Sequence, residues 1–521
     1  MPYQFNGSRR PSPQVGVGLS AWGTAKPVTM SESVLNAIPG ALAWLSLGVV
    51  FVAAWKAPLV MLLGAALLAF YSAVRFVFAG VAVFLGLRRI REWEAIDWQH
   101  WYAEHATPAS LPLDAVHHLV IIPNYREKAE ILRASLQRLA EQQIAREQIT
   151  VMLAMESGED GAIEKGRLLK QEFEGYFAHF FVEVHPKGLH QEMQCKSANQ
   201  AWASRWAKRR LVDEGNYALE NIIVTTMDAD TLWHKNYLMA LSARFATDEN
   251  RYAAFWQAPI RYHSNVWDVN PFIRLIHGYS SAWELAYLAA PWWQALPMSS
   301  YSLSLQLLDS AGYWDPDVIA DEWHMYIKAH FKREGDLVLR PVFLPFSANA
   351  TSGENLLSAF RQRYEQTLRH AWGAKEIGYT IAQIQNNPHQ DRARSLHLLF
   401  RVAHDNLLAG AGWIILTAGT QLPALLHAEQ VQNWTNTPQF LLLQASFFVV
   451  TLLSLLFWWV DVRTRPVRTR EQTPKERLYT LISLPALPLV TLICVALPVL
   501  HSQTRLMMGK QLQFNVTRKF F

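Results

Sequence analysis

The stretch Ile222-Ile223-Val224-Thr225-Thr226-Met227-Asp228-Ala229-Asp230 decides the fold class of this chain. Its first half consists of β-branched residues, which favour a β-strand. Two aspartates that flank a single alanine follow this strand directly. The segment therefore predicts a strand that ends in a pair of carboxylates.

The segments before this strand alternate between strand-like and helical patterns. Strand-like runs cover residues 119–123, 149–155 and 180–184, and helical patterns cover residues 129–139, 163–173 and 197–207. Strands that alternate with helices form a mostly parallel sheet, so the sequence predicts an α/β fold. Ligands of such open sheets bind beyond the carboxyl ends of the strands, where this chain has mainly acidic residues. No glycine-rich dinucleotide or P-loop motif follows any of these strands.

The composition indicates a protein that lies partly in a membrane. Of its 521 residues, 51% are hydrophobic and only 17% are charged, against roughly 25% in soluble proteins. A mean hydropathy of +0.02 excludes a wholly embedded transporter, because a large soluble block must offset the apolar runs. The net charge of +5 comes mainly from residues that flank these runs, so we expect no nucleic-acid partner. The two cysteines, Cys195 and Cys494, cannot build a disulfide framework.

Five apolar runs are long enough to cross a lipid bilayer. They cover residues 34–55, 59–87, 402–426, 440–460 and 478–500. Pro485, Pro488 and Pro498 permit a bent or re-entrant last run. The predicted organisation is a disordered tail (1–33), two transmembrane helices (34–87), a cytosolic domain (88–400) with interfacial helices near 355–400, three transmembrane or re-entrant segments (401–500) and a C-terminal tail (501–521).

The basic residues predict the orientation in the membrane. Residues 427–437 contain no Lys or Arg, whereas residues 461–477 contain six. Because short basic loops stay in the cytoplasm, we expect residues 461–477 and the block 88–400 on the cytoplasmic side. The sequence thus predicts a multi-pass protein of the cytoplasmic (inner) membrane.

Two acidic pairs are candidate catalytic groups. Asp228 and Asp230 are spaced so that both can approach one divalent cation bound to diphosphate oxygens. The alternative is that Asp230 or Thr231 caps a helix predicted from His234 to Phe245. Asp321 and Glu322 start another helical run, where an ionised carboxylate can act as a general base or can simply occupy a solvated first turn.

Gln366, Arg369 and His370 form a third candidate group. On a helix they lie within one turn and can face one pocket, whereas Trp372 points elsewhere. A guanidinium fork matches a diphosphate, while the alternative is an amphipathic helix at the membrane surface. Four further tryptophans are candidates for stacking on sugars, with core packing or a belt at the membrane interface as the alternative for most of them: Trp292, Trp293, Trp314 and Trp323.

The order of these motifs resembles the membrane-embedded glycosyltransferase family 2, of the cellulose-synthase-like and bacterial polysaccharide-synthase-like type. In that family a GT-A catalytic domain lies between transmembrane helices. Five segments are similar to the family's P-x-x-N-E, K-x-x-N, D-x-D, T-E-D and Q-x-x-R-W motifs: Pro123–Glu127, Lys196–Asn199, Asp228–Asp230, Ala320–Glu322 and Gln366–His370. The tail from Gly509 to Lys519 also resembles that of the family, and His370 stands where the family has tryptophan.

The resemblance implies an inverting glycosyltransferase that moves a sugar from a nucleotide sugar, first of all a UDP-sugar, to a saccharide or lipid-linked acceptor in polysaccharide or glycolipid synthesis. It implies Mg²⁺ or Mn²⁺ on Asp230 and Asp228, and Glu322 or else Asp321 as the general base. The implied donor-binding residues are Pro123, Asn124, Glu127, Glu156, Lys196, Asp228, Gln366, Arg369 and His370. The missing tryptophan at position 370 argues against processive polymerisation. The alternative from another class is a membrane scaffold or translocation subunit with a degenerate transferase domain.

Overall fold

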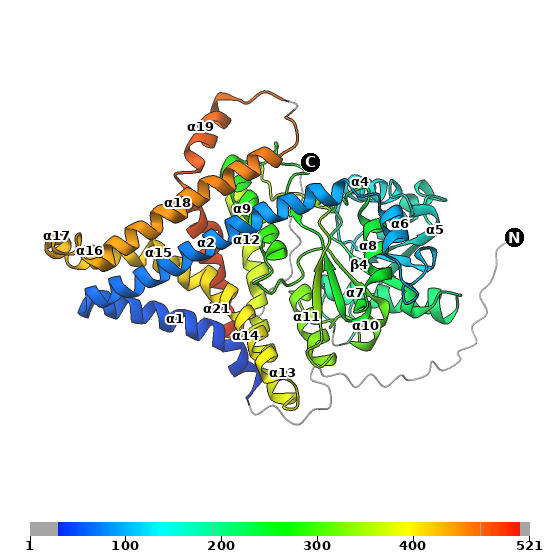
Figure 1. Ribbon diagram of the computed structural model, residues 1–521, viewed down its shortest axis with the longest axis horizontal. Helices are drawn as coiled ribbons and strands as arrows, with labels where there is room; N and C mark the ends of the chain where they lie inside the picture. The colour runs from blue at the N-terminus through cyan, green and yellow to red at the C-terminus, as the bar shows by residue number, and fades with distance from the viewer. Residues whose placement is uncertain (1–29, 191, 469, 511–521) are drawn as a thin grey trace.

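The computed structural model describes residues 30–190, 192–468 and 470–510. Within them, an α/β domain joins a bundle of long apolar helices, and the two parts form the right and left halves of Figure 1. Most of the predicted N-terminal tail and residues 511–521 of the predicted C-terminal tail lie outside these ranges.

A seven-stranded sheet forms the centre of the α/β domain, with the strand order β3-β2-β1-β4-β7-β5-β8. Strands β1 to β4 are parallel, and β7 runs antiparallel to both of its neighbours. The strands are β1 (His117–Pro123), β2 (Ile149–Glu156), β3 (His179–His185), β4 (Ile222–Thr226), β5 (Ala254–Gln257), β7 (Tyr301–Ser304) and β8 (Val338–Pro341), and β6 (Ile260–Arg261) pairs separately with β9 (Phe346–Ser347). The predicted α/β class, with a mostly parallel sheet between apolar helices, is confirmed.

Helices cover both faces of the sheet, because successive strand residues point into two different apolar cores. In β1, Val120 and Ile122 belong to one core, and Leu119 and Ile121 belong to the other. The first core is covered by α3 (Trp98–His105), α4 (Ala129–Ala140), α5 (Ala145–Gln148), α6 (Ala162–Glu172) and α8 (Tyr237–Thr247), and the second by α7 (Lys196–Lys208), α10 (Leu305–Ser310) and α11 (Asp321–Lys332). With both faces covered, the strand ends are left to form a ligand site.

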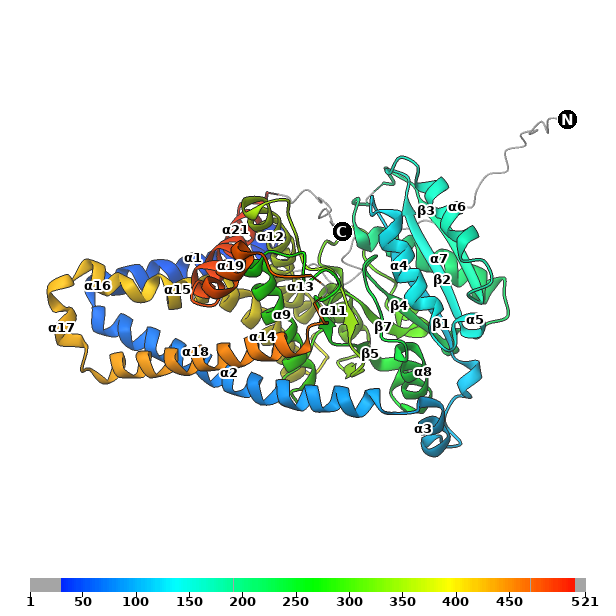
Figure 2. The same cartoon turned by 90° about the horizontal axis from the view of Figure 1, so that it is seen from above.

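Among the described residues, five helical segments are long and apolar enough to cross a membrane, which agrees with the predicted number. They are α1 (Glu32–Lys56), α2 (Pro58–Glu94), the segment Arg392–Leu426, α18 (Pro438–Thr464) and the segment Leu487–Met507. The third span comprises α14 (Arg392–Leu407), α15 (Trp413–Thr417) and α16 (Leu422–Leu426), the short α17 (Val431–Trp434) follows it, and the fifth comprises α20 (Leu487–Thr491) and α21 (Leu497–Met507). Helix α2 extends beyond the predicted end at residue 87 and carries the chain from the bundle to the α/β domain (Figure 2).

The last predicted apolar run, residues 478–500, is divided in the structure. Its first residues belong to the short α19 (Pro474–Ser483), and the span begins only at Leu487. A proline lacks an N–H group and disfavours the helical region for the residue before it, so Pro485 and Pro488 separate the two helices. The predicted bounds of this run were wrong at both ends, since the span continues to Met507.

Three helices lie where the domain meets the bundle: α9 (Pro271–Ala289), α12 (Leu356–His370) and α13 (Lys375–Asn386) (Figures 1 and 2). Helix α9 packs the ring of Trp283 edge-on against Phe76 of α2 and Phe457 of α18. Helix α12 begins with a reciprocal capping box between Asn355 and Ser358, which fixes its first turn. These helices place side chains between the membrane spans and the carboxyl ends of the strands.

Candidate active site

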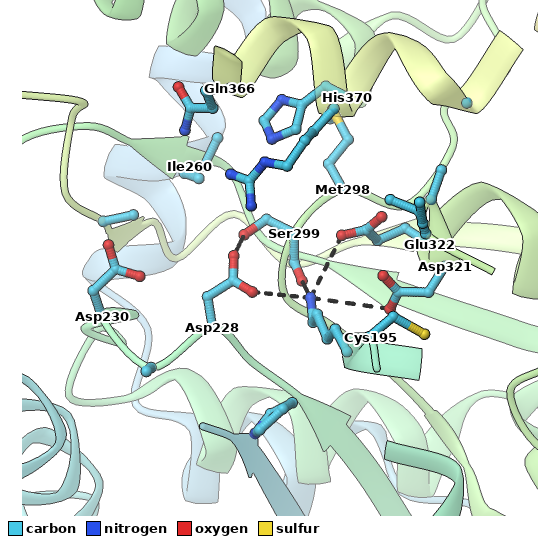
Figure 3. A pocket seen from close by; sticks show the side chains of 18 of the residues that line it. Cys195, Asp228, Asp230, Ile260, Met298, Ser299, Asp321, Glu322, Gln366 and His370 are labelled. Carbon is cyan, nitrogen blue, oxygen red and sulfur yellow. Dashed lines mark hydrogen bonds and ion pairs between the residues drawn. The ribbon is translucent and has the colours of Figure 1, made fainter. Parts of the chain in front are cut away.

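A cavity of about 530 Å³ lies beyond the carboxyl ends of β1, β2 and β4, with residues of α11 and α12 in its wall (Figure 3). Every site residue predicted from the sequence lines it: Pro123, Asn124, Glu127, Glu156, Lys196, Asp228, Asp230, Asp321, Glu322, Gln366, Arg369 and His370. The fold thus brings the whole predicted set together from segments that are far apart in the chain.

Lys196, the first residue of α7, joins three carboxylates. Its Nζ lies 2.9 Å from Asp228 Oδ1, 3.5 Å from Glu322 Oε1 and 4.0 Å from Asp321 Oδ2 (Figure 3). Burial opposes the charge on the ammonium group, but the carboxylates, Asp228 first, raise the pKa of Lys196 well above its ordinary value. One cation that stays protonated therefore connects the D-x-D pair with the acidic pair of α11.

Asp321 and Glu322 differ in their access to the cavity. The Asp321 side chain is 3% exposed, whereas that of Glu322 is 24% exposed. Burial raises the pKa of Glu322, and the charge of Asp321 raises it further, while Lys196 acts in the opposite direction. A carboxylate whose pKa moves toward neutrality is a more effective general base. The geometry and the electrostatics both favour Glu322 for that role.

Ser299 holds Asp228 from a backbone conformation that is unusual for a residue with a side chain. Its φ of +56° lies in the left-handed region. Its Oγ donates to Asp228 Oδ2 at 2.7 Å, and its carbonyl oxygen accepts from Lys196 Nζ at 3.1 Å (Figure 3). The backbone N–H of Asp228 donates to the Oγ of the next residue, Ser300. Strain of this kind persists where surrounding contacts fix it, and it is concentrated at functional sites.

For the sugar transfer that the family resemblance implies, we expect Ser299→Gly to lower the rate about tenfold or more, because a hydrogen bond to a charged group contributes about 1.5–3 kcal/mol. The loss of this hydrogen bond lowers the stability, but glycine adopts positive φ freely, so the melting temperature is expected to fall only slightly. Thermal unfolding and nucleoside diphosphate release measure the two effects. Glu334→Gly, at an exposed position with φ +54°, is the matched control and should keep full activity. Full activity in Ser299→Gly would contradict the positioning of Asp228 by this hydroxyl.

Asp230 lies in the loop after β4, where its Oδ2 accepts the backbone N–H of Asn349 at 3.0 Å. It does not cap the next helix, since α8 starts at Tyr237 with Asn236 as its N-cap. Among the described residues there is no group of three or more His, Cys, Asp or Glu side chains that would hold a metal by themselves. A cation here would take Asp228 and Asp230 together with diphosphate oxygens and water. That set fits Mg²⁺ or Mn²⁺, since such ions commonly bind one or two carboxylates plus substrate phosphates.

The ends of β1 and β2 present acidic groups whose positions are fixed by neighbours. Glu127 Oε2 accepts the N–H of Tyr125 at 2.7 Å. Both carboxylate oxygens of Glu156 lie 3.2 Å from His185 Nδ1, and His185 Nε2 lies 2.8 Å from Glu192. Burial opposes protonation of His185, but its two glutamate partners raise its pKa above the ordinary value. The Glu156 carboxylate is therefore held in one orientation at this end of the cavity.

The last turns of α12 bring Gln366, Arg369 and His370 to the cavity, and Trp372 lies outside the cavity lining. Figure 3 shows Gln366 and His370 extending from the same helix. Gln366 Oε1 accepts from Arg363 Nη1 at 2.8 Å, which fixes the amide. Burial, with the charges of Arg369 and Arg363, lowers the pKa of His370 to about 3, so its imidazole is neutral. The helix thus offers one cation and one neutral ring to a ligand.

Two acidic partners of a buried histidine connect α11 to α13. His324 Nε2 lies 2.8 Å from Asp315, and its Nδ1 lies 2.9 Å from Glu376 of α13. Burial opposes the charge, but Glu376 and Asp315 raise the pKa of His324 to about 9. The resulting ion cluster fixes the helix that carries Glu322 relative to the segment that follows α12.

Of the four candidate tryptophans, Trp323 lines the cavity. Trp314 is a core residue whose indole N–H donates to Tyr301 at 2.8 Å. Trp293 packs edge-on against a histidine of the third span, and Trp292 is half-exposed. The core-packing alternative therefore holds for Trp314.

The cavity lining also contains polar residues that no sequence motif indicated, among them Tyr262, Glu284, Ser299 and Asn406. They lie in loops, in α9 and in one of the candidate membrane spans. No motif spacing marks such positions, so the tertiary structure was needed to find them.

Comparisons with known proteins identify the family. The family model described as "Glycosyl transferase family group 2" matches residues 223–494, more than half of the chain. Among solved structures, the mannosyltransferase PcManGT from Pyrobaculum calidifontis, in complex with GDP-Man and Mn²⁺, is similar at 15% identity and a TM-score of 0.41, with 82% of this chain and 98% of that chain covered. TarS 1–349 from S. aureus, in complex with UDP-GlcNAc, is similar at 12% identity and a TM-score of 0.31, with 77% and 94% covered. The search of curated proteins found no match.

Proposed function

The chain belongs to glycosyl transferase family group 2, and from this membership we propose that it is an inverting glycosyltransferase of the cytoplasmic membrane. In this proposal it moves a hexosyl group from a nucleotide sugar to a saccharide or lipid-linked acceptor, in polysaccharide or glycolipid synthesis. The observation that carries the proposal is the contact of Lys196 with Asp228 and Glu322, because it unites the D-x-D motif and the candidate base in one cavity.

The proposed chemistry is a single displacement at the anomeric carbon. Glu322 accepts the proton of an acceptor hydroxyl, whose oxygen bonds to the anomeric carbon while the bond from that carbon to the diphosphate breaks. Attack opposite the leaving diphosphate inverts the configuration. Asp230 and Asp228 would hold Mg²⁺ or Mn²⁺, which neutralises charge on the diphosphate. Arg369 contributes a guanidinium fork on the same group.

A UDP-sugar is the proposed donor. Glu156, at the end of β2, accepts an N–H group of the base, and Pro123, Asn124 and Glu127 surround the nucleotide from the end of β1. Lys196 and Gln366 contact the donor on the side of the D-x-D motif, and His370 lies next to Arg369. All of these groups line the same cavity, which supports a shared ligand.

The direct test is release of nucleoside diphosphate by the purified full-length protein in detergent. UDP-glucose, UDP-galactose, UDP-N-acetylglucosamine and GDP-mannose would each be supplied with Mg²⁺ or Mn²⁺. We expect turnover of at least one donor, and its loss with a chelator. Binding of a nucleotide sugar without any turnover would favour the scaffold or translocation alternative instead.

The proposed orientation places residues 461–477 in the cytoplasm together with the α/β domain. Both native cysteines are buried, so single engineered cysteines can report on access. We expect an impermeant maleimide added outside spheroplasts to label Gln432→Cys, and to label Val467→Cys only after permeabilisation, because basic loops stay in the cytoplasm. Labelling of Val467→Cys in intact spheroplasts would overturn this orientation.

Arg369→Lys tests whether the guanidinium binds the diphosphate. Lysine keeps the charge but loses the planar fork, so we expect about a tenfold or greater loss of transfer. Membrane association should not change, because the charge at the interface is the same. Arg361→Lys, on the same helix with a side chain that is 79% exposed, is the matched control and should retain full activity. Equal activity of both variants would leave only an interfacial role for Arg369.

A further inference from the structure

Glu284 of α9 is a carboxyl group in the cavity wall that none of the steps above uses. Its Oε1 accepts from the hydroxyl of Tyr262 at 3.4 Å, a long contact. Its Oε2 is buried and has no hydrogen-bond partner within the part of the chain that the structure describes. Because buried carboxyl oxygens are normally hydrogen-bonded, this oxygen indicates a group that arrives with a ligand.

This pair lies where α9 and the segment after β6 contribute to the cavity wall. Glu284 lies on the interfacial helix that packs against α2 and α18, and Tyr262 follows directly on the short strand β6. Asn406 of the third span lines the same cavity. In Figure 3, Ile260 of β6 and Gln366 appear on one side of the view, and Asp321 and Glu322 appear on the other. The wall that faces the membrane bundle therefore carries its own polar groups.

The charges around Glu284 narrow the class of ligand. Burial raises the pKa of Glu284 to about 8, although the Tyr262 hydroxyl and the charge of Arg363 lower it. Near pH 7 the group is therefore mostly protonated and can both donate and accept a hydrogen bond. Among the described residues, no metal-binding cluster contains Glu284. A neutral carboxyl beside a phenol and its aromatic ring suits hydroxyl groups on an apolar sugar face, and does not suit a phosphate or a cation.

We propose that Glu284 and Tyr262 form a subsite that binds hydroxyl groups of the saccharide acceptor on the bundle side of the cavity. This inference rests on the proposed transferase function. It narrows the acceptor to one that carries a saccharide at this subsite. The subsite takes no part in proton transfer, which belongs to Glu322. Its role is to orient the acceptor so that one hydroxyl faces the anomeric carbon of the donor, and it therefore affects transfer to sugar but not to water.

The experiment compares two products in the same reaction. Purified full-length protein receives the donor that it turns over best, with a mixture of cellobiose, maltose and N,N′-diacetylchitobiose as acceptors. Nucleoside diphosphate release counts all cleavage of the donor, and mass spectrometry of the saccharides counts transfer to sugar. In Glu284→Gln and in Tyr262→Phe, we expect the ratio of transfer to release to fall about tenfold, which corresponds to about 1.4 kcal/mol. In a separate reaction without saccharide, the release of nucleoside diphosphate should stay within about twofold of the wild type.

Tyr279→Phe is the matched control, because it also removes a hydroxyl group from α9. That hydroxyl donates to the carbonyl oxygen of Ser454 in α18 and not to a cavity residue. The ratio in this variant should equal that of the wild type. An unchanged ratio in both subsite variants would overturn the proposal, and so would an equal loss of release and transfer, which would mean an effect on the donor or on folding. Donor cleavage by the wild type without transfer to any of the saccharides would overturn the saccharide subsite alone. Absence of donor cleavage by the wild type would instead count against the transferase function itself.

Discussion

Asp230→Ala is expected to reduce sugar transfer by about a thousandfold, the upper range for loss of one group that stabilises charge in a transition state. The carboxylate lies in the loop after the central strand β4, and the N–H of Asn349 fixes one of its oxygens. If it holds the cation on the diphosphate, its removal leaves the departing charge uncompensated. The loop lies beyond the carboxyl end of β4 and outside the packed sheet, so the fold should not depend on this side chain.

Donor cleavage and thermal unfolding of the same preparation distinguish loss of chemistry from loss of folding. Asp114→Ala, at an exposed position before β1, should leave both quantities unchanged. Titration of Mn²⁺ adds a second readout, since weaker metal binding should raise the concentration that restores activity. Substantial activity of Asp230→Ala in the presence of a chelator would remove the metal from the proposed mechanism.

The features that the sequence predicted correctly depend on short stretches of chain. The β-branched run 222–226 is a strand because its side chains pack on both faces, and the aspartates after it lie at the strand end for the same local reason. The apolar spans depend on length and hydropathy alone. Parallel pairing of β1 to β4 follows from the helices between them. In each case one segment carries enough information to fix its own structure.

The features that could not be predicted depend on contacts between distant segments. Strands β5, β7 and β8 have four residues each, too few for a pattern, and β7 is antiparallel within an otherwise mainly parallel sheet. The positive φ of Ser299 has no signal in a serine. Glu284 lies in a helix that is mainly apolar, so its place in the cavity follows only from how α9 packs on α2 and α18. The sequence motifs identified the acidic residues, but their common contact with Lys196 is a property of the tertiary structure.

Glu322→Gln is expected to lower the turnover number by about a thousandfold, within the range that general acid–base groups contribute. The glutamine keeps the size of the side chain and its place beside Lys196, but it cannot accept the proton of the acceptor hydroxyl. The Michaelis constant for the donor should change little, because the lost step is chemical. Asp321→Asn, which alters the less exposed partner, should reduce turnover less. The reverse order of the two effects would assign the base to Asp321.

The pH dependence of the wild type provides an independent check on Glu322. Burial and then the charge of Asp321 raise its pKa above the usual glutamate value, so the acid limb of activity should lie above the range of ordinary carboxylates. A base works only when it is deprotonated, and activity should therefore rise with pH through that limb. Asp321→Asn removes the like charge and leaves Lys196 to favour the ionised form, so the limb should move to lower pH. If the acid limb stays at the same pH in Asp321→Asn, the group that titrates in catalysis is not next to Asp321. That result would contradict Glu322 as the general base.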